Sequence, residues 1–93
     1  MPLRTKPITQ PAMLTPAQLR AARALLGWSR EQLATKSGTA AMTVRAFESR
    51  GSDPKRSTLL AWSRAIEGAG VGLIHEDDQG GAGLRFKAAS KRK

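Results

Sequence analysis

Two helix-start signals divide the first half of this chain into short helices. The segments Thr-Pro-Ala-Gln at 15–18 and Ser-Arg-Glu-Gln at 29–32 each place a hydroxyl residue three positions before a glutamine. In this pattern, the capping box, the two side chains bind free N–H groups of the first helical turn. Gly27 and Gly38 follow at positions where a left-handed residue can end a helix. We therefore expect one helix from Thr15 to about Gly27 and a second from Ser29 to about Gly38.

Apolar residues at helical spacing predict which faces of these helices are buried. The same spacing predicts a third helix at about 40–49 and a fourth at about 55–69. The expected core positions of the four helices are Leu19, Ala22, Leu25, Leu26, Leu33, Ala34, Val44, Phe47, Leu59, Trp62 and Ile66.

Two short apolar runs follow the helices, at 71–75 and 84–87, and a glycine-rich stretch separates them. Such runs are typical of short β-strands. Residues 1–13 contain three prolines and no repeated apolar position, which is typical of a flexible basic arm. Residues 88–93 read as a basic, disordered tail. We therefore expect a mainly α domain of four to five helices at 14–70, with a short C-terminal β segment at 71–87.

The charge of the chain indicates an anionic partner. It carries 16 Lys and Arg against 7 Asp and Glu, a formal net charge of +9 over 93 residues. Nucleic acid and a membrane surface are the two classes of partner that such an excess suits. A membrane-surface protein needs a long basic amphipathic helix, which the sequence lacks. We therefore favour nucleic acid, and a basic protein without an anionic partner is the alternative.

Targeting signals and disulfides are not apparent in the sequence. No apolar run has the length of a membrane span, and residues 1–13 lack the apolar core of a secretory signal. The chain has no cysteine, which suits a reducing compartment. We expect a cytoplasmic protein.

Residues of the kinds that carry catalysis or bind metals are few. His75 is followed by three consecutive acids, but one histidine and an acidic run do not match the ligand spacing of metal sites. The serines have no paired histidine base, and the glycine-rich run lacks the lysine of a phosphate-binding loop. We expect no enzyme activity, no metal site and no cofactor.

The segment from Leu14 to about Ile66 resembles the lambda-repressor-like, Cro/C1-type helix-turn-helix family of bacterial and phage regulators. The matching motifs are Gln-Leu-Ala at 32–34, Ser-Gly at 37–38, Thr-Val at 43–44, and Phe-Glu at 47–48 before Gly51. The stretch LGWSREQLA at 26–34 is similar to a compact subfamily with a short β segment after the helices. The resemblance implies a DNA-binding transcriptional regulator whose third helix enters the major groove. It also implies a bacterial protein that associates with the nucleoid when it is bound to DNA.

One face of the third helix is expected to read DNA bases. At about 100° per residue, this face lies opposite Val44 and Phe47. The resemblance implies base contacts on this face and at the helix start, at Ala41, Met42, Arg45, Ala46 and Ser49. Alanine and methionine offer only apolar contact with thymine methyl groups, so shape and methyl contact would supply part of the readout. Arg45 suits guanine, although a phosphate contact by Arg45 is an equal alternative.

Phosphate contacts are expected where hydroxyl and cationic side chains lie near helix ends. The candidates are Ser29, Arg30, Thr43, Arg50, Lys55 and Arg56. Lys55 and Arg56 open the fourth helix, where two cations oppose the helix dipole, and a phosphate partner would explain that placement. Solvated loop charges are the alternative explanation.

Two structural expectations concern the third helix. The resemblance implies an ion pair between Arg23 of the first helix and Glu48 of the third. Ala40 occupies the position where the family often has Ser or Thr as the N-cap of the third helix, so the capping hydrogen bond would be lost. If the helix starts one residue earlier, Thr39 could supply this hydrogen bond instead.

A palindromic operator needs two recognition helices, so we expect a homodimer on double-stranded DNA. The dimer contacts are expected in the β segment, at Val71, Leu73, Ile74, Leu84 and Phe86. Pairing of these strands between two chains is favoured over a hairpin folded back on its own domain. An antitoxin that binds a toxin protein and represses its own operon is the alternative function, which an adjacent toxin gene would favour. RNA binding is less favoured because the sequence shows no aromatic platform.

Overall fold

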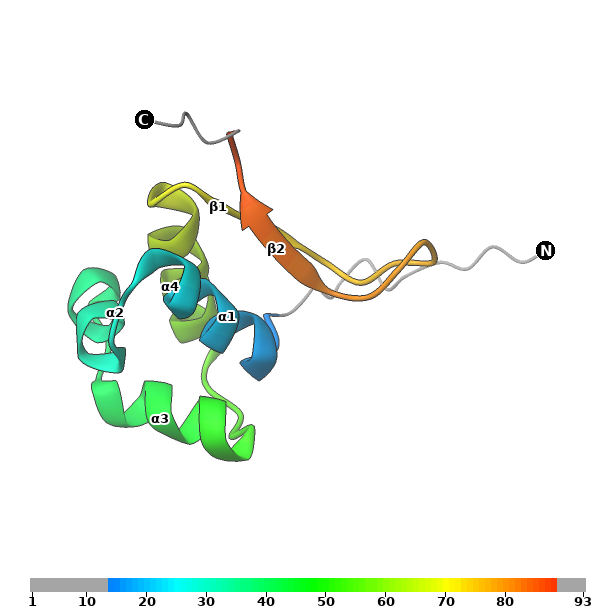
Figure 1. Ribbon diagram of the computed structural model, residues 1–93. Helices are drawn as coiled ribbons and strands as arrows, with labels where there is room; N and C mark the ends of the chain where they lie inside the picture. Colours follow the sequence, from blue (N-terminus) through cyan, green and yellow to red (C-terminus); the bar gives the residue numbers. More distant parts are fainter. Residues whose placement is uncertain (1–13, 89–93) are drawn as a thin grey trace.

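The computed structural model describes residues 14–88 as four helices followed by a two-stranded hairpin (Figure 1). The helices are α1 (Pro16–Leu26), α2 (Arg30–Ser37), α3 (Ala41–Arg50) and α4 (Arg56–Gly68), and the strands are β1 (Val71–Ile74) and β2 (Gly83–Phe86). This is the mainly α fold with a short C-terminal β segment that the sequence predicts. The expected arm at 1–13 lies outside the described residues. So does the tail expected at 88–93, except for its first residue.

Both capping boxes are present and set the starts of α1 and α2. The hydroxyl oxygen of Thr15 accepts from the N–H of Gln18 at 3.1 Å, and Oε1 of Gln18 accepts from the N–H of Thr15 at 2.9 Å. Ser29 and Gln32 repeat the arrangement at 3.0 and 2.8 Å. Gly27 ends α1 with a φ of 69°, a left-handed conformation in which the absence of a Cβ atom avoids strain. Local sequence therefore fixes the positions of these two helices.

The start of α3, in contrast, has no side-chain cap. The N-cap residue is Ala40, and no side chain accepts a hydrogen bond from the first helical turn. Thr39 does not take over this role, because α3 begins at Ala41 and the Thr39 hydroxyl is engaged elsewhere. Its oxygen accepts from the indole N–H of Trp62 at 2.9 Å and lies 2.9 Å from the hydroxyl oxygen of Ser37. The hydrogen bond from Trp62 thus attaches the turn between α2 and α3 to α4.

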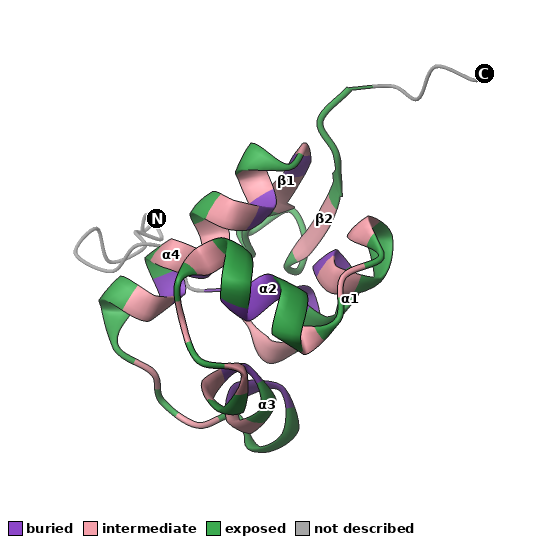
Figure 2. Cartoon of the chain, turned by 90° about the vertical axis from the view of Figure 1, so that its left-hand side faces the viewer, coloured by how far each residue is buried: buried purple, intermediate pink, exposed green. Residues whose placement is uncertain are grey.

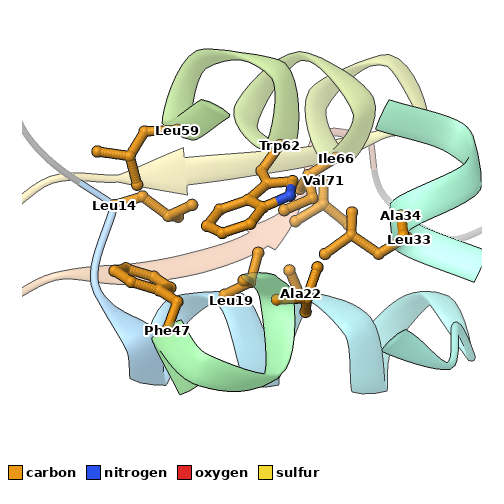
Figure 3. Packing of buried hydrophobic residues seen from close by; sticks show 11 residues of the cluster. Leu14, Leu19, Ala22, Leu33, Ala34, Phe47, Leu59, Trp62, Ile66 and Val71 are labelled. Atoms are coloured by element: carbon orange, nitrogen blue, oxygen red, sulfur yellow. The ribbon is translucent and has the colours of Figure 1, made fainter. Parts of the chain in front are cut away.

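Trp62 lies at the centre of the core, surrounded by side chains from the other helices (Figure 3). It has no exposed surface, and its ring centroid is 5.3 Å from that of Phe47 with the ring planes tilted by 41°. Every expected core position except Leu25 is buried or packs against this cluster. Leu14 and Val71, which flank the helical domain in sequence, complete the core.

α1 meets the core through Leu19, Ala22 and Leu26 as expected, but not through Leu25. Leu25 is 41% exposed, whereas Gln18 is only 3% exposed. The hairpin explains this, because the side-chain amide of Gln18 donates to the carbonyl oxygens of Ile74 and Gly83 at 3.0 and 2.9 Å. Leu25 lies about two turns further along the same side of α1, beyond these contacts.

β1 and β2 pair with each other in antiparallel register, with Val71 opposite Phe86 and Ile74 opposite Gly83. This is the pairing within one chain, the alternative to the pairing between chains that we favoured from the sequence. Figure 1 shows the hairpin lying across α1 and α4, with α3 on the other side of α1.

Two contacts explain why the strands fold back on each other despite their long loop. The loop contains a tight turn, in which the N–H of Asp77 donates to the carbonyl oxygen of Gly80 at 3.0 Å. Gln18 then holds both strands from outside the hairpin. Val71 has no exposed surface and belongs to the core of its own chain, and its expected contact in a dimer stays a prediction.

Candidate nucleic-acid interface

α3 is held against the core along one side. Val44 is fully buried, and Phe47 and Glu48 are 6% and 5% exposed. The N–H of Thr39 donates to the carbonyl oxygen of Ala34 at 2.9 Å, which closes the turn that leads from α2 into α3. The opposite side of α3 faces away from the other helices (Figure 2).

This outward side carries three of the five expected base-contact residues in exposed positions. Met42 is 73% exposed, and Arg45 and Ser49 are exposed as well. Ala46 is half-buried beside them. Ala41 is also half-buried and packs against the core, so its methyl group is turned partly inward. The open face therefore offers one guanidinium, one hydroxyl and one thioether to a ligand.

Exposed cations follow the open face of α3 in the sequence. Arg50 is the last residue of α3, and Lys55 and Arg56 open α4 after a short loop. Lys55 is the N-cap residue of α4, and no side chain accepts from the first turn of that helix. Free N–H groups beside two cations form an environment that attracts an anion such as a phosphate.

The other residues expected to contact phosphates are less available to a ligand. The hydroxyl of Ser29 is the N-cap acceptor of α2. Nε of Arg30 donates to a carboxylate oxygen of Glu48 at 3.1 Å, and the Arg30 side chain is 35% exposed. Thr43 is half-buried in the first turn of α3. Arg30 is therefore already engaged within the protein.

Arg23 and Glu48 form the ion pair expected between the first and third helices. Nε and Nη2 of Arg23 donate to the two carboxylate oxygens of Glu48 at 2.7 and 2.8 Å, a bidentate geometry. The Glu48 side chain has no exposed surface and that of Arg23 is 17% exposed. The hydrogen bonds to Glu48 raise the pKa of Arg23 above its ordinary value, so this guanidinium stays charged. The buried carboxylate is thus compensated, and α1 is tied to α3.

Two short helices joined by a tight turn, with the second fixed on one side and open on the other, form a helix-turn-helix. A helix-turn-helix family model matches residues 19–68, more than half of the chain. The chain belongs to the Cro/C1-type helix-turn-helix family. This lambda-repressor-like family consists of DNA-binding regulators of transcription. No curated protein matches the chain.

In this helix-turn-helix protein Glu48 has two contacts that sequence reasoning missed. Besides the contact of Arg30, Nη1 of Arg20 donates to the backbone carbonyl oxygen of Glu48 at 2.7 Å. Arg20 and Arg23 are three positions apart and therefore lie on the same side of α1. This spacing indicates that, if Arg23 contacts α3, Arg20 can contact it as well. The contact of Arg30 depends on the angle between α1 and α2, which no local pattern fixes.

The acidic stretch after β1 does not gather into a metal site among the described residues. Within 14–88, no group of three or more His, Cys, Asp or Glu side chains could hold a metal ion. His75, Asp77 and Asp78 are exposed in the loop between β1 and β2. No described helix of this helix-turn-helix protein is long and apolar enough to cross a membrane.

Proposed function

We propose that this protein is a sequence-specific transcriptional regulator that acts as a homodimer on a palindromic operator, with α3 in the major groove of each half-site. The observation that carries the proposal is the orientation of α3. Val44, Phe47 and Glu48 are buried, so Met42 and Arg45 are left on the free side. Family membership supports DNA binding itself.

The free face of α3 suits a readout with few hydrogen bonds. Met42 can pack against thymine methyl groups, and Ala46 offers a smaller apolar contact beside it. Arg45 can bind guanine O6 and N7 together, which discriminates by about 1–3 kcal/mol against the wrong base. Ala41 contributes less than expected because it packs partly against the core.

Phosphate contacts would fix the position of α3 in the groove. Arg50 ends α3, and Lys55 and Arg56 begin α4; all three are exposed and have no ion-pair partner among the described residues. Such contacts add affinity for any sequence, while the base contacts select the operator. Two copies of α3, about 34 Å apart, would read the two half-sites.

The test is selection of bound duplexes from a random library, followed by titration of the selected and a scrambled duplex. We expect a palindromic consensus, and we expect Arg45→Ala to relax the preference at one position in each half-site. Arg64→Ala, which removes an exposed arginine of α4, is the matched control and should leave the preference intact. Equal weakening on both duplexes by Arg45→Ala would instead make Arg45 a phosphate contact. Absence of any enriched sequence would contradict the proposed function.

A further inference from the structure

The outer face of the hairpin carries two cations. Leu73 and Leu84 stand opposite each other and pack against the core, so the alternate residues of both strands point away from the helices. Arg85 is one of these residues and stands opposite Gly72. The side chain of Lys87, directly after β2, lies on the same face, because its Cγ is 3.5 Å from the position that a Cβ atom on Gly72 would occupy.

The rest of the hairpin leaves both cations uncompensated. Arg85 and Lys87 are exposed, and neither has an ion-pair partner among the described residues. Arg85 stands opposite Gly72, and the N–H of Lys87 donates to the carbonyl oxygen of Gly70 at 2.8 Å. Each cation therefore faces a glycine, so no side chain of the neighbouring strand covers or neutralises its charge.

Two glycines of this face are not required by the fold. Gly72 and Gly83 do not have a positive φ. A Cβ atom on Gly83 would meet no other part of the chain within 4 Å, and one on Gly72 would make only an ordinary contact with Lys87. Glycine in a strand weakens it and often marks the close approach of another backbone. The two positions therefore leave an open surface beside Arg85 and Lys87.

The acidic residues of the hairpin lie at its other end. Glu76, Asp77 and Asp78 belong to the loop beyond the last paired residues of the two strands. From Gly72, which is level with Arg85, to Glu76 the chain spans up to about 13 Å. This exceeds the Debye length of about 8 Å at physiological ionic strength, so the acids offset the two cations only weakly.

The hairpin and α3 lie on opposite sides of α1 (Figure 1). A duplex seated on α3 would have to bend around the domain to reach the outer face of the hairpin. DNA is stiff over about 150 base pairs, so it does not curve around a body as small as this domain. A duplex that contacts the outer face is therefore a different segment from the one on α3.

We propose that the outer face of the hairpin binds the phosphate backbone of a second DNA segment, so that the protein links two duplexes. Arg85 and Lys87 would contact phosphates, which makes binding there independent of base sequence. Several copies bound along one duplex would act together on the other. A membrane surface suits this face less, because Ile74 is the only large apolar side chain among its described residues. The proposal adds to operator binding and does not rest on it.

The test is the capture of two duplexes by the full chain. A long duplex on beads is covered with protein, and retention of a labelled duplex of unrelated sequence is measured. Arg85→Gln combined with Lys87→Gln should cover the beads like wild type but retain about tenfold less labelled duplex, because two phosphate contacts are lost. Lys36→Gln combined with Arg64→Gln removes the same charge from α2 and α4 and is the matched control.

A second measurement isolates the hairpin from the α3 side. In a variant that combines Arg45→Ala, Lys55→Ala and Arg56→Ala, the remaining affinity for an unrelated duplex should fall about tenfold between 50 and 200 mM salt, as two phosphate contacts predict. Adding Arg85→Gln and Lys87→Gln should remove most of that affinity. No operator is used here, so failure of the operator proposal would leave the outcome unchanged.

Circular dichroism verifies that each variant is folded. Gly72→Glu gives an independent test, because a Cβ atom fits there and the carboxylate would lie beside both cations, so retention of the labelled duplex should fall as well. Equal retention by the Arg85 and Lys87 double variant and its charge-matched control would overturn the proposal. Parallel loss of bead coverage and retention would also overturn it, because both surfaces would then contact one duplex. Binding of phosphatidylserine vesicles through Arg85 and Lys87, without capture of a second duplex, would make the partner a membrane instead.

Discussion

Arg23 donates two hydrogen bonds to the carboxylate of Glu48, and this bidentate pair joins the first helix to the helix that faces outward. Removal of Glu48 leaves the guanidinium of Arg23, whose side chain is only 17% exposed, without its carboxylate, and it also removes the acceptor of Arg30. We expect Glu48→Ala to lower the free energy of unfolding by about 3–5 kcal/mol. Asp78→Ala, in the exposed hairpin loop, is the control and should change it by less than about 0.5 kcal/mol. Urea denaturation measures both, and a loss at Glu48 no larger than that of the control would show that the pair adds no stability.

The pH dependence of this contribution follows from Arg23. Its pKa is raised in the folded state, so its stabilising effect is complete below the unfolded-state pKa and is lost only as the pH rises through the folded-state pKa. Both values lie far above neutral pH. The difference in unfolding free energy between wild type and Glu48→Gln should therefore be the same at pH 7 and pH 9, by urea denaturation at each pH. A difference that shrinks towards pH 9 would argue against a charged Arg23 as its source.

Gln18 and Gln32 occupy the same position in their two capping boxes but differ in what else they bind. Gln18→Glu keeps the oxygen that accepts from Thr15 and replaces the amide that donates to Ile74 and Gly83. We expect a loss of about 1–3 kcal/mol, because two partly buried carbonyl oxygens lose the side-chain donor and face a carboxylate. Gln32→Glu should stay within about 0.5 kcal/mol of wild type, because Gln32 is exposed. Thermal denaturation of the two variants compares them, and equal effects would show that Gln18 acts only as a cap.

The uncapped start of α3 offers a stabilising substitution. Ala40→Ser restores a side-chain acceptor for the first turn, and we expect a gain of about 1 kcal/mol in the free energy of unfolding. Ala69→Ser, at the exposed C-cap of α4, is the control and should give no such gain. If urea denaturation finds no gain at Ala40, the first N–H groups of α3 are not short of a partner.

Lys55 and Arg56 should act on DNA affinity without affecting sequence preference. Replacing either by alanine should weaken binding to the operator and to a scrambled duplex by the same factor. The slope of the logarithm of the binding constant against the logarithm of salt concentration should become shallower by about 0.9 for each lost contact. Titrations at several salt concentrations measure this, with Arg64→Ala as the control. An unchanged slope would identify the two residues as solvated charges.

Local sequence predicted the helices of this protein well, because their boundaries are set by short-range contacts. The boxes at Thr15 and Ser29 and the glycine after α1 involve residues at most four positions apart from their partners, so they can be predicted without knowledge of the fold. The family resemblance added how the helices are arranged, and the matched family model confirms it. The absence of a side-chain cap at Ala40 was also visible from the residue type alone.

The misjudged features all depend on contacts between distant parts of the chain. The helical spacing of Leu25 predicts a core position, but its burial depends on how far the hairpin extends along α1. Val71 reads as part of a free strand, yet it enters the core because β1 packs on α4. Arg30 reads as a free cation, and its contact with Glu48 depends on the angle between two helices. Periodicity shows which residues share a face but not what will cover it.

The attachment of the hairpin through Gln18 has a consequence for the order in which the protein opens. The carbonyl oxygens that Gln18 binds belong to residues 56 and 65 positions later in the chain, whereas the capping contacts of α1 and α2 span three. Of the residues in β1 and β2, only Val71 is buried, and segments with few buried apolar contacts open more readily than the core in native-state hydrogen exchange. The amides of β1 and β2 should therefore exchange ahead of those of α3 and α4, and the hairpin can detach while the helix-turn-helix remains intact.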